Sequence, residues 1–285
     1  MVPSQKIYSL FPNLEQKIKG QTPFFFSDFD GTLAPIRRDP AKVVLSIRAR
    51  TLLNALTLRM PVAIISGRPL TYLHKIIDRP KIVLAGNHGL EIDIPGDKKW
   101  PSTRFCHPEA IASKKKIHQL AGKLQHGFSG TRGVLIEDKG LTLTLHYRSV
   151  LPALHEAVFK TFNEIVQPFQ DGNRISVSRG KMCLEVRPDI DWGKADAMQW
   201  ILNLYQKRCD GMAFFPVYMG DDETDKPAIA LAHKKGISLF KDDGRGIARR
   251  VPNVEATYHV ASHEEIIRFM QYLISLNHLD SGSNK

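Results

Sequence analysis

Short apolar runs alternate with amphipathic stretches at both ends of the chain. The runs that predict buried strands are "PFFFSD", "PVAIIS" and "KIVLAG" toward the N-terminus, and "FFPVYM" and "GISLF" toward the C-terminus. Helices are predicted over residues 46–59, from Pro69 onward, over 194–206, over 224–235, and after Ser262, which opens a capping box with Glu265. Strands and helices in alternation are typical of a parallel sheet with helices on both faces.

The middle of the chain shows a different pattern. A helix over residues 108–125 precedes the strands "GVLIED" and "LTLTLHYR", and a helix over residues 151–166 precedes "RISVSR" and "KMCLEVRP". Strands joined by a short glycine-containing turn pair in antiparallel fashion. We therefore predict an α/β fold in which a smaller α+β insert with an antiparallel sheet interrupts the core. The predicted boundaries are a first core segment over 1–97, the insert over 98–190, and a second core segment over 191–285.

Two carboxylates directly follow the first apolar strand, in "SDFDGTL". Residues i and i+2 of an extended chain point the same way, so we expect Asp28 and Asp30 to project together at the carboxyl end of that strand. Two such carboxylates titrate separately, so one can act as a nucleophile and the other as a proton shuttle. A divalent cation with oxygen ligands, such as Mg²⁺, would relieve their repulsion. A calcium loop also opens with this spacing, but its sixth position needs glycine and is Leu33 here.

A second acidic strand end follows toward the C-terminus. The string "GDDETD" supplies Asp221, Asp222 and Asp225 after another apolar strand. Two acidic strand ends in one parallel sheet predict a shared metal site. Between them, "AIISGRP" places Ser66 and the Gly67 amide at a strand end and helix start, where an anion is favoured. Lys194 opens the helix after the insert and can neutralise an anion in the same crevice.

Composition narrows the functional classes. The chain has 285 residues, 42% of them hydrophobic, which is enough for sizeable cores. It lacks both a run of about 18 apolar residues and the apolar region of a signal peptide. We therefore expect no membrane partner. Three well-separated cysteines do not predict a disulfide framework, so we expect a cytoplasmic protein. The net charge of +11 suits an anionic partner, but the short basic runs lack neighbouring aromatic residues, so no nucleic acid is expected.

The strings "DFDGTL", "ISGR", Lys194 and "GDDETD", in this order, resemble the four motifs of the haloacid dehalogenase (HAD) superfamily of phosphatases. The longer strings "GNHGLEI", "EDKGLTLTLHYR", "KMCLEVRP" and "DWGKADAMQWIL" are similar to the trehalose-6-phosphate phosphatase family within it. The resemblance extends from about residue 22 to residue 274. It implies a Rossmann-like HAD core with a parallel sheet, and an insert that forms a C2-type cap.

The resemblance also implies a mechanism. One aspartate would attack phosphorus and form an aspartyl phosphate, while the other would protonate the leaving sugar oxygen and then activate water. The implied catalytic residues are Asp28 as the nucleophile, Asp30 as the acid and base, and Ser66 and Lys194 on the phosphoryl oxygens. The implied Mg²⁺ ligands are the Asp28 carboxylate, the Asp30 carbonyl and Asp221, with Asp222 or Asp225 in support.

Substrate choice is expected to depend mainly on the insert. Strand alternation places Lys181, Glu185 and Arg187 on one face of a strand whose other face is apolar, which is typical of a ligand-facing wall. Charged groups there can bind sugar hydroxyls through strong hydrogen bonds. The expected substrate-binding residues are Gly67, Arg68, Asn87 and His88 in the core, and Glu137, Lys139, His146, Arg148, Lys181, Glu185 and Arg187 in the insert.

The resulting hypothesis is a Mg²⁺-dependent phosphatase that hydrolyses trehalose 6-phosphate to trehalose and phosphate, the last step of trehalose biosynthesis. A trehalose-phosphate synthase is a candidate protein partner. The alternatives are the same chemistry on sucrose phosphate, mannosyl-phosphoglycerate or glucosylglycerol phosphate, and a catalytically silent sugar-binding regulator. A basic nucleic-acid-binding module is a further alternative, which steep salt dependence of binding would reveal.

Overall fold

The computed structural model describes residues 10–37, 42–77, 81–170, 175–180, 182–242 and 254–276. The chain divides into a core unit, Met1–Arg104 with Trp192–Lys285, and an insert unit, Phe105–Asp191. The predicted α/β core interrupted by an α+β insert is therefore confirmed. The first division falls after Arg104, within strand β5 (Thr103–Cys106), whereas the predicted boundary is after residue 97.

The described part of the core unit contains an eight-stranded sheet in the order β12-β11-β10-β1-β2-β3-β4-β5. Its other strands are β1 (Pro23–Ser27), β2 (Val62–Ile65), β3 (Ile82–Gly86), β4 (Glu91–Ile94), β10 (Phe215–Gly220), β11 (Ile237–Lys241) and β12 (Tyr258–Val260). The central strands pair in parallel, whereas β3 and β4 are antiparallel. Strand β4 and the two edge strands, β5 and β12, were not predicted from the sequence.

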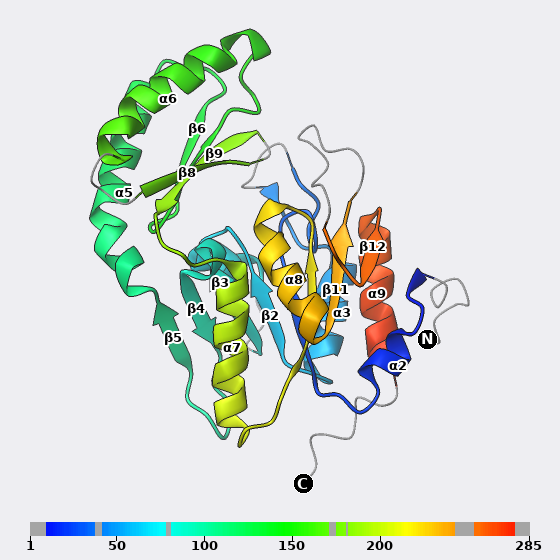
Figure 1. The fold of residues 1–285 in the computed structure, drawn as a ribbon. Coiled ribbons are helices and arrows are strands. Elements are labelled where there is room, and N and C mark those ends of the chain that lie inside the picture. Colours follow the sequence, from blue (N-terminus) through cyan, green and yellow to red (C-terminus); the bar gives the residue numbers. More distant parts are fainter. Residues whose placement is uncertain are drawn as a thin grey trace. The chain divides into compact units, whose positions relative to one another are not determined.

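Helices cover both faces of this sheet (Figure 1). They are α2 (Leu14–Ile18), α3 (Ile47–Thr57), α4 (Leu70–Ile76), α7 (Lys194–Arg208), α8 (Lys226–Lys235) and α9 (His263–Ser275). Phe25 packs into the apolar cluster shared with α3 and α9. Phe24 stacks on Phe26, with 4.4 Å between ring centroids, and lies 4.8 Å from the Tyr205 ring of α7. A strand buried on both faces explains the three consecutive phenylalanines.

The insert unit is built on a four-stranded sheet of its own in the described residues, in the order β6-β7-β9-β8. All its pairings are antiparallel. The strands are β6 (Leu135–Asp138), β7 (Leu143–His146), β8 (Ile175–Gly180) and β9 (Cys183–Pro188), and the helices are α5 (Pro108–Gly127) and α6 (His155–Gln170). Leu143, Leu145 and Leu184 form an apolar core with the helices. The opposite face of the sheet is therefore left for polar side chains.

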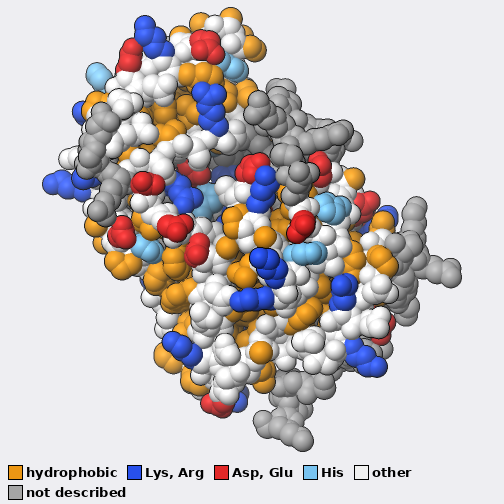
Figure 2. Space-filling view, in the orientation of Figure 1, with side chains coloured by type: hydrophobic (Ala, Val, Ile, Leu, Met, Phe, Trp, Pro, Cys, Tyr) orange, Lys and Arg blue, Asp and Glu red, His pale blue; other side chains and the backbone are white. Residues whose placement is uncertain are grey.

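On the face drawn in Figure 2, neither the charged nor the apolar side chains gather into a single dominant patch. Lysine and arginine side chains there are scattered among acidic, apolar and uncharged ones. Within the described ranges, no helix combines the length and the apolar character needed to cross a bilayer. None of the three cysteines takes part in a disulfide.

Candidate active site

The candidate active site begins where strands β1 and β10 end side by side. Ser27 pairs with Met219 in the parallel ladder, and the Asp28 amide donates to the Met219 carbonyl at 2.9 Å. The loops that follow the two strands are therefore neighbours. One carboxylate oxygen each of Asp28, Asp221 and Asp225 lies within 4.8 Å of the others, and all three residues are buried. The structure thus brings together the two acidic strand ends.

Asp225 is held by four hydrogen bonds from the protein. Its Oδ1 accepts from the Lys194 Nζ at 2.8 Å and from the Tyr218 hydroxyl at 2.6 Å. Its Oδ2 accepts from the backbone N–H groups of Asp221 and Asp222, each at 3.1 Å. Both oxygens are therefore engaged, and Asp225 connects the ammonium group to the acidic loop after β10. This arrangement suits a residue that positions the cluster rather than one that contacts a cation directly.

Lys194 is the counter-charge of the cluster. It is the first residue of α7, is 3% exposed, and its Nζ donates to Asp28 Oδ1 at 2.7 Å as well as to Asp225. Burial by itself lowers the pKa of Lys194, but the charges of Asp225 and Asp28 outweigh it and raise that pKa well above its usual value. The group therefore stays cationic. An ammonium has three N–H donors, and these contacts occupy two of them.

Asp28 has one buried oxygen, Oδ2, that has no hydrogen-bond partner among the described residues. Burial raises the pKa of the Asp28 carboxyl well above its usual range, and the charges of Asp225 and Asp221 act in the same direction while Lys194 opposes them. A buried polar atom that lacks a partner is costly, so the Oδ2 position suits an electrophile or a cation. When ionised, the three clustered carboxylates carry two more formal charges than Lys194 can neutralise.

The residues after Asp30 explain the sequence "DGT". Gly31 has φ +94°, in the left-handed region that favours glycine, and a Cβ there would collide with the Asp221 carboxylate. Thr32 then donates from its hydroxyl to Asp221 Oδ1 at 3.4 Å. The loop after β1 consequently lies against the loop after β10, which keeps Asp221 close to Asp28.

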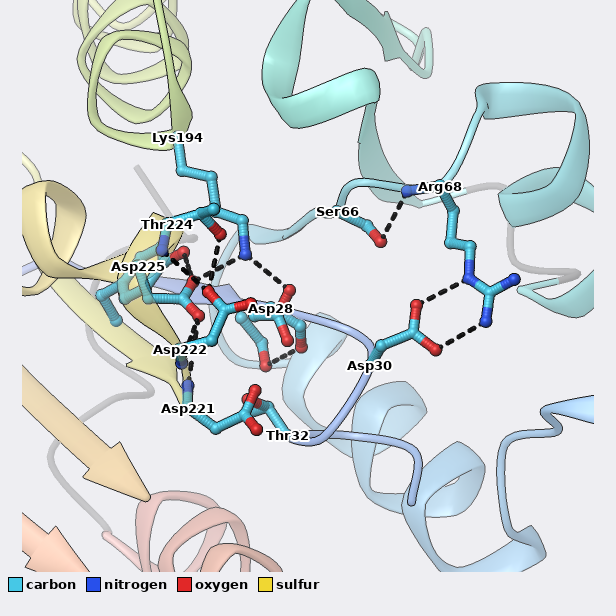
Figure 3. Close-up of polar contacts among 12 residues, drawn as sticks. Asp28, Asp30, Thr32, Ser66, Arg68, Lys194, Asp221, Asp222, Thr224 and Asp225 are labelled. Atoms are coloured by element: carbon cyan, nitrogen blue, oxygen red, sulfur yellow. Dashed lines mark hydrogen bonds and ion pairs between the residues drawn. The ribbon is translucent and has the colours of Figure 1, made fainter. Parts of the chain in front are cut away.

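Asp28 and Asp30 have different partners, contrary to the expectation that they project together. The Asp30 carboxylate turns toward Arg68, whose Nε and Nη2 donate to it at 2.7 Å and 2.8 Å (Figure 3). The reason is that β1 ends at Ser27, and a turn closed by the Gly31 N–H on the Ala34 carbonyl follows. Strand alternation does not apply in such a turn. Arg68, predicted to bind substrate, thus contacts the second carboxylate.

The loop after β2 places Ser66 beside this ion pair. Ser66 is fully buried, and its Oγ accepts the Arg68 backbone N–H at 3.1 Å. The Ser66 carbonyl accepts the His88 N–H at 2.8 Å. Gly67 lies so close to His88 that an added Cβ would be 2.8 Å from the imidazole Nε2. The predicted core residues around Ser66 therefore form one packed loop cluster.

The "GNHG" string adopts an unusual backbone. Asn87 and His88 both have left-handed φ angles, 50° and 59°, directly after β3. The Asn87 amide donates to Glu91 Oε1 at 2.7 Å, and the same oxygen accepts the Leu70 N–H at 2.9 Å. Strained conformations of this kind occur at functional sites when the surrounding structure supports them. Glu91 supplies that support here.

In the described part of the insert unit, the polar face of the sheet carries an ion pair and a histidine–carboxylate hydrogen bond. Thr144 on β7 lies opposite Glu137 of β6 and Glu185 of β9. His146 and Glu137 are joined at 2.8 Å, and Lys139 donates to Glu185 at 3.0 Å. Burial lowers the pKa of Lys139, but the charges of Glu185 and Glu137 outweigh it and raise that pKa. Lys139 therefore remains a cation within this face.

The alternation predicted for β9 is present in the described residues. Cys183, Glu185 and Arg187 are half-buried, whereas Leu184 and Val186 are buried. Arg148 is half-buried and follows β7. Lys181, predicted to lie on the same face as Glu185, falls outside the described residues.

Residues 26–259 match the model of a protein family described as trehalose-phosphatase. The chain belongs to the trehalose-phosphatase family. The match includes the loops after β1, β2 and β10 and the whole insert unit, so the resemblance drawn from the motifs is confirmed.

Individual members of the trehalose-phosphatase family align over much of the chain. Probable trehalose-phosphate phosphatase 4 of Oryza sativa subsp. japonica is 27% identical over 277 residues, which are 97% of this chain and 72% of that protein. The trehalose-phosphate phosphatase of Mycobacterium avium (strain 104) is 32% identical over 215 residues, 74% of this chain and 52% of that one. The solved C-terminal domain of C. albicans trehalose-6-phosphate phosphatase superposes with a TM-score of 0.73 at 22% identity, covering 97% of this chain and 99% of that domain. This likeness confirms the predicted fold, an α/β core with an inserted α+β unit.

Three polar residues of this family member were not identified as site residues from the sequence. They are Tyr218, which donates a hydrogen bond to Asp225; Thr32, which donates one to Asp221; and Glu91, which accepts one from Asn87. Burial and the Asp225 charge raise the pKa of Tyr218 well above its usual value, which keeps the phenol a donor. A tyrosine inside an apolar strand was the available signal, because a buried phenol needs a hydrogen-bond partner.

Proposed function

We propose that the protein hydrolyses trehalose 6-phosphate to trehalose and phosphate through a phosphoryl group carried on Asp28. The observation that carries the proposal is the buried, unpartnered Oδ2 of Asp28, next to Asp221 and with Oδ1 held by Lys194. This geometry leaves one oxygen of an oriented carboxylate without a hydrogen bond in the described residues, and that oxygen would form the bond to phosphorus. Membership of the trehalose-phosphatase family supports the choice of substrate.

The proposed reaction has two steps. In the first, Asp28 Oδ2 bonds to phosphorus, the bond from phosphorus to the sugar C6 oxygen breaks, and Asp30 gives that oxygen a proton. In the second, Asp30 takes a proton from water as the water oxygen bonds to phosphorus, and the bond to Asp28 breaks to release phosphate. The remaining Lys194 N–H and the Ser66 hydroxyl hold the phosphoryl oxygens. Phosphoryl transfer depends mainly on such alignment and electrostatic stabilisation.

A divalent cation fits the donor set of this site. The Asp28 and Asp221 carboxylates and the Asp30 carbonyl would hold Mg²⁺, and Asp222 or Asp225 would support these ligands without contacting the ion. The excess negative charge of the cluster supports this choice. When bound, the cation would offset repulsion between these carboxylates and the phosphate. The ammonium of Lys194 alone does not balance them.

Removal of divalent metal should therefore stop the reaction. We expect phosphate release to fall to background in excess chelator and to return when Mg²⁺ is restored. Mg²⁺ at about 100 times its Kd should also stabilise the protein by about 2.7 kcal/mol. Thermal unfolding with and without Mg²⁺ checks this, and Asp221→Asn should reduce the shift. Full turnover in chelator, or a thermal shift unaffected by Asp221→Asn, would contradict the proposed site.

We further propose that the polar face of the insert unit selects the sugar. Glu185→Ala should lower kcat/KM for trehalose 6-phosphate by about 10- to 100-fold, because a hydrogen bond to a charged group contributes about 1.5–3 kcal/mol. The loss on p-nitrophenyl phosphate, which has no sugar, should be much smaller. Glu156→Ala on the exposed surface of α6 is the matched control and should change neither substrate. Equal losses on both substrates would remove Glu185 from this role.

A substrate panel tests the function as a whole. Phosphate release should be fastest from trehalose 6-phosphate, compared with sucrose phosphate, mannosyl-phosphoglycerate, glucosylglycerol phosphate and glucose 6-phosphate. Turnover of trehalose 6-phosphate no faster than that of a generic ester would overturn the proposal.

The proposal also includes a cytoplasmic location, which is supported by the absence of disulfides among the three cysteines. A synthase partner stays a prediction.

A further inference from the structure

The Arg68–Asp30 ion pair is a contact near the proposed catalytic groups that has no role in the proposed reaction. The two groups meet through two parallel hydrogen bonds, Nε to Oδ2 at 2.7 Å and Nη2 to Oδ1 at 2.8 Å. The Arg68 side chain is 9% exposed and that of Asp30 is 31% exposed. Bidentate pairing fixes the plane of a carboxylate as well as its distance, which a single donor does not do.

Arg68 is itself fixed from several directions. Its backbone N–H donates to Ser66 Oγ at 3.1 Å, and its carbonyl accepts the Asn87 N–H at 2.8 Å. Its guanidinium lies over the Tyr72 ring, 4.5 Å from the centroid. The Tyr72 hydroxyl donates to the Val43 carbonyl at 2.9 Å, so the ring is anchored too. A guanidinium stacked and tethered in this way is ordered before any ligand arrives.

Asp30 depends on Arg68 for its orientation. It lies in the turn after β1, where the backbone is set by the Gly31 N–H on the Ala34 carbonyl at 2.7 Å. In the described residues, the two hydrogen bonds that orient its carboxylate come from Arg68. Asp28, by contrast, is oriented by Lys194. Figure 3 shows the two carboxylates facing these separate cations.

We propose that Arg68 is a positioning residue that aims the Asp30 carboxylate at the leaving oxygen of the substrate, rather than a residue that selects the sugar. The proposal rests on the proposed role of Asp30 as acid and base. A guanidinium does not give up its proton in proteins, so Arg68 takes no part in the proton transfer itself. Its contribution is geometric, and a misplacement of about 1 Å can cost about 100-fold in rate.

Two substrates with different leaving groups provide the first readout. A sugar alkoxide needs a proton as it departs, whereas p-nitrophenolate does not. Because kcat/KM reports the steps up to departure of that group, Arg68→Ala should lower it for trehalose 6-phosphate by about 100-fold. The loss on p-nitrophenyl phosphate should be much smaller. Arg68→Lys, which keeps the charge but loses the second hydrogen bond, should give an intermediate loss; circular dichroism and thermal unfolding check that each variant folds.

A double-mutant cycle with Asp30→Asn separates positioning from sugar binding. If Arg68 acts through Asp30, adding Arg68→Ala to Asp30→Asn should cause little further loss on trehalose 6-phosphate. Glu185→Ala is the matched control, since its effect should persist in the Asp30→Asn background. A full additional loss from Arg68→Ala in that background, carried by a raised KM, would overturn the inference and make Arg68 a sugar-binding residue. Full activity of Asp30→Asn alone would instead refute the proposed acid, which is a distinguishable failure.

Discussion

Asparagine in place of Asp28 should abolish phosphate release from trehalose 6-phosphate. An amide oxygen does not attack phosphorus, and loss of the covalent nucleophile of a hydrolase can cost up to about 10⁶-fold in kcat. We expect a loss of at least about 10³-fold for Asp28→Asn, because residual binding and electrostatic groups do not replace a missing bond-forming atom. The measurement is initial-rate phosphate release at saturating substrate and Mg²⁺.

The same variant should keep its fold. The introduced amide would still offer an oxygen to the Lys194 ammonium. In the present structure, Asp28 Oδ1 accepts a hydrogen bond from Lys194 Nζ at 2.7 Å. The substitution would also remove one negative charge from a buried cluster of three carboxylates, so the free energy of unfolding without Mg²⁺ should be equal or higher. Retention of more than about a tenth of the rate, equivalent to ~1.4 kcal/mol, would contradict the nucleophile assignment.

Lys194→Met should destabilise the core unit strongly and remove activity. The lysine is the common partner of Asp28 and Asp225, at 2.7 Å and 2.8 Å, and methionine fills similar space without charge. Removing one partner of a buried ion pair leaves the other charge uncompensated, which costs about 3–5 kcal/mol. Urea unfolding of the metal-free protein measures this free energy directly.

Two further variants isolate the buried contact. Lys207→Met, at an exposed position in the last turn of the same helix α7, should change the unfolding free energy by no more than about 0.5 kcal/mol. Asp225→Asn added to Lys194→Met should recover some of the loss, because it removes one of the two stranded charges. If Lys194→Met lowered the unfolding free energy by less than about 1 kcal/mol, the ion pair would be as weak as a solvent-exposed one. That result would contradict the assignment of Lys194 as the buried counter-charge of the cluster.

The central sheet could be predicted from the sequence because its strands are apolar on both faces. β1 and β10 are buried nearly throughout, so their hydrophobic runs stand out from the surrounding polar residues. The outer strands β4, β5 and β12 are three or four residues long and mix polar with apolar positions. Such short segments form strands by pairing with a neighbour already in the sheet, and single-sequence patterns do not contain that information.

The meeting of Asp28 with Asp221 was also predictable, since the carboxyl ends of parallel strands lie at one edge of a sheet. The pairing of Asp30 with Arg68 was not. It depends on the turn after Ser27, which ends the strand alternation, and on a guanidinium group that lies over the Tyr72 ring. The contact of Tyr218 with Asp225 likewise depends on how the loop after β10 folds back. Loop conformation, rather than residue type, decided these contacts.

Trapping the phosphorylated enzyme tests the role of Asp28 most directly. The Asp30→Asn variant is mixed with p-nitrophenyl phosphate and Mg²⁺, quenched in acid, reduced with borohydride and mapped by mass spectrometry. Because p-nitrophenolate leaves without a proton while the later hydrolysis lacks its base, a nucleophilic Asp28 predicts a burst of p-nitrophenol and conversion of residue 28 from aspartate to homoserine. A burst accompanied by modification of any other residue, or steady turnover with residue 28 never modified, would contradict that role.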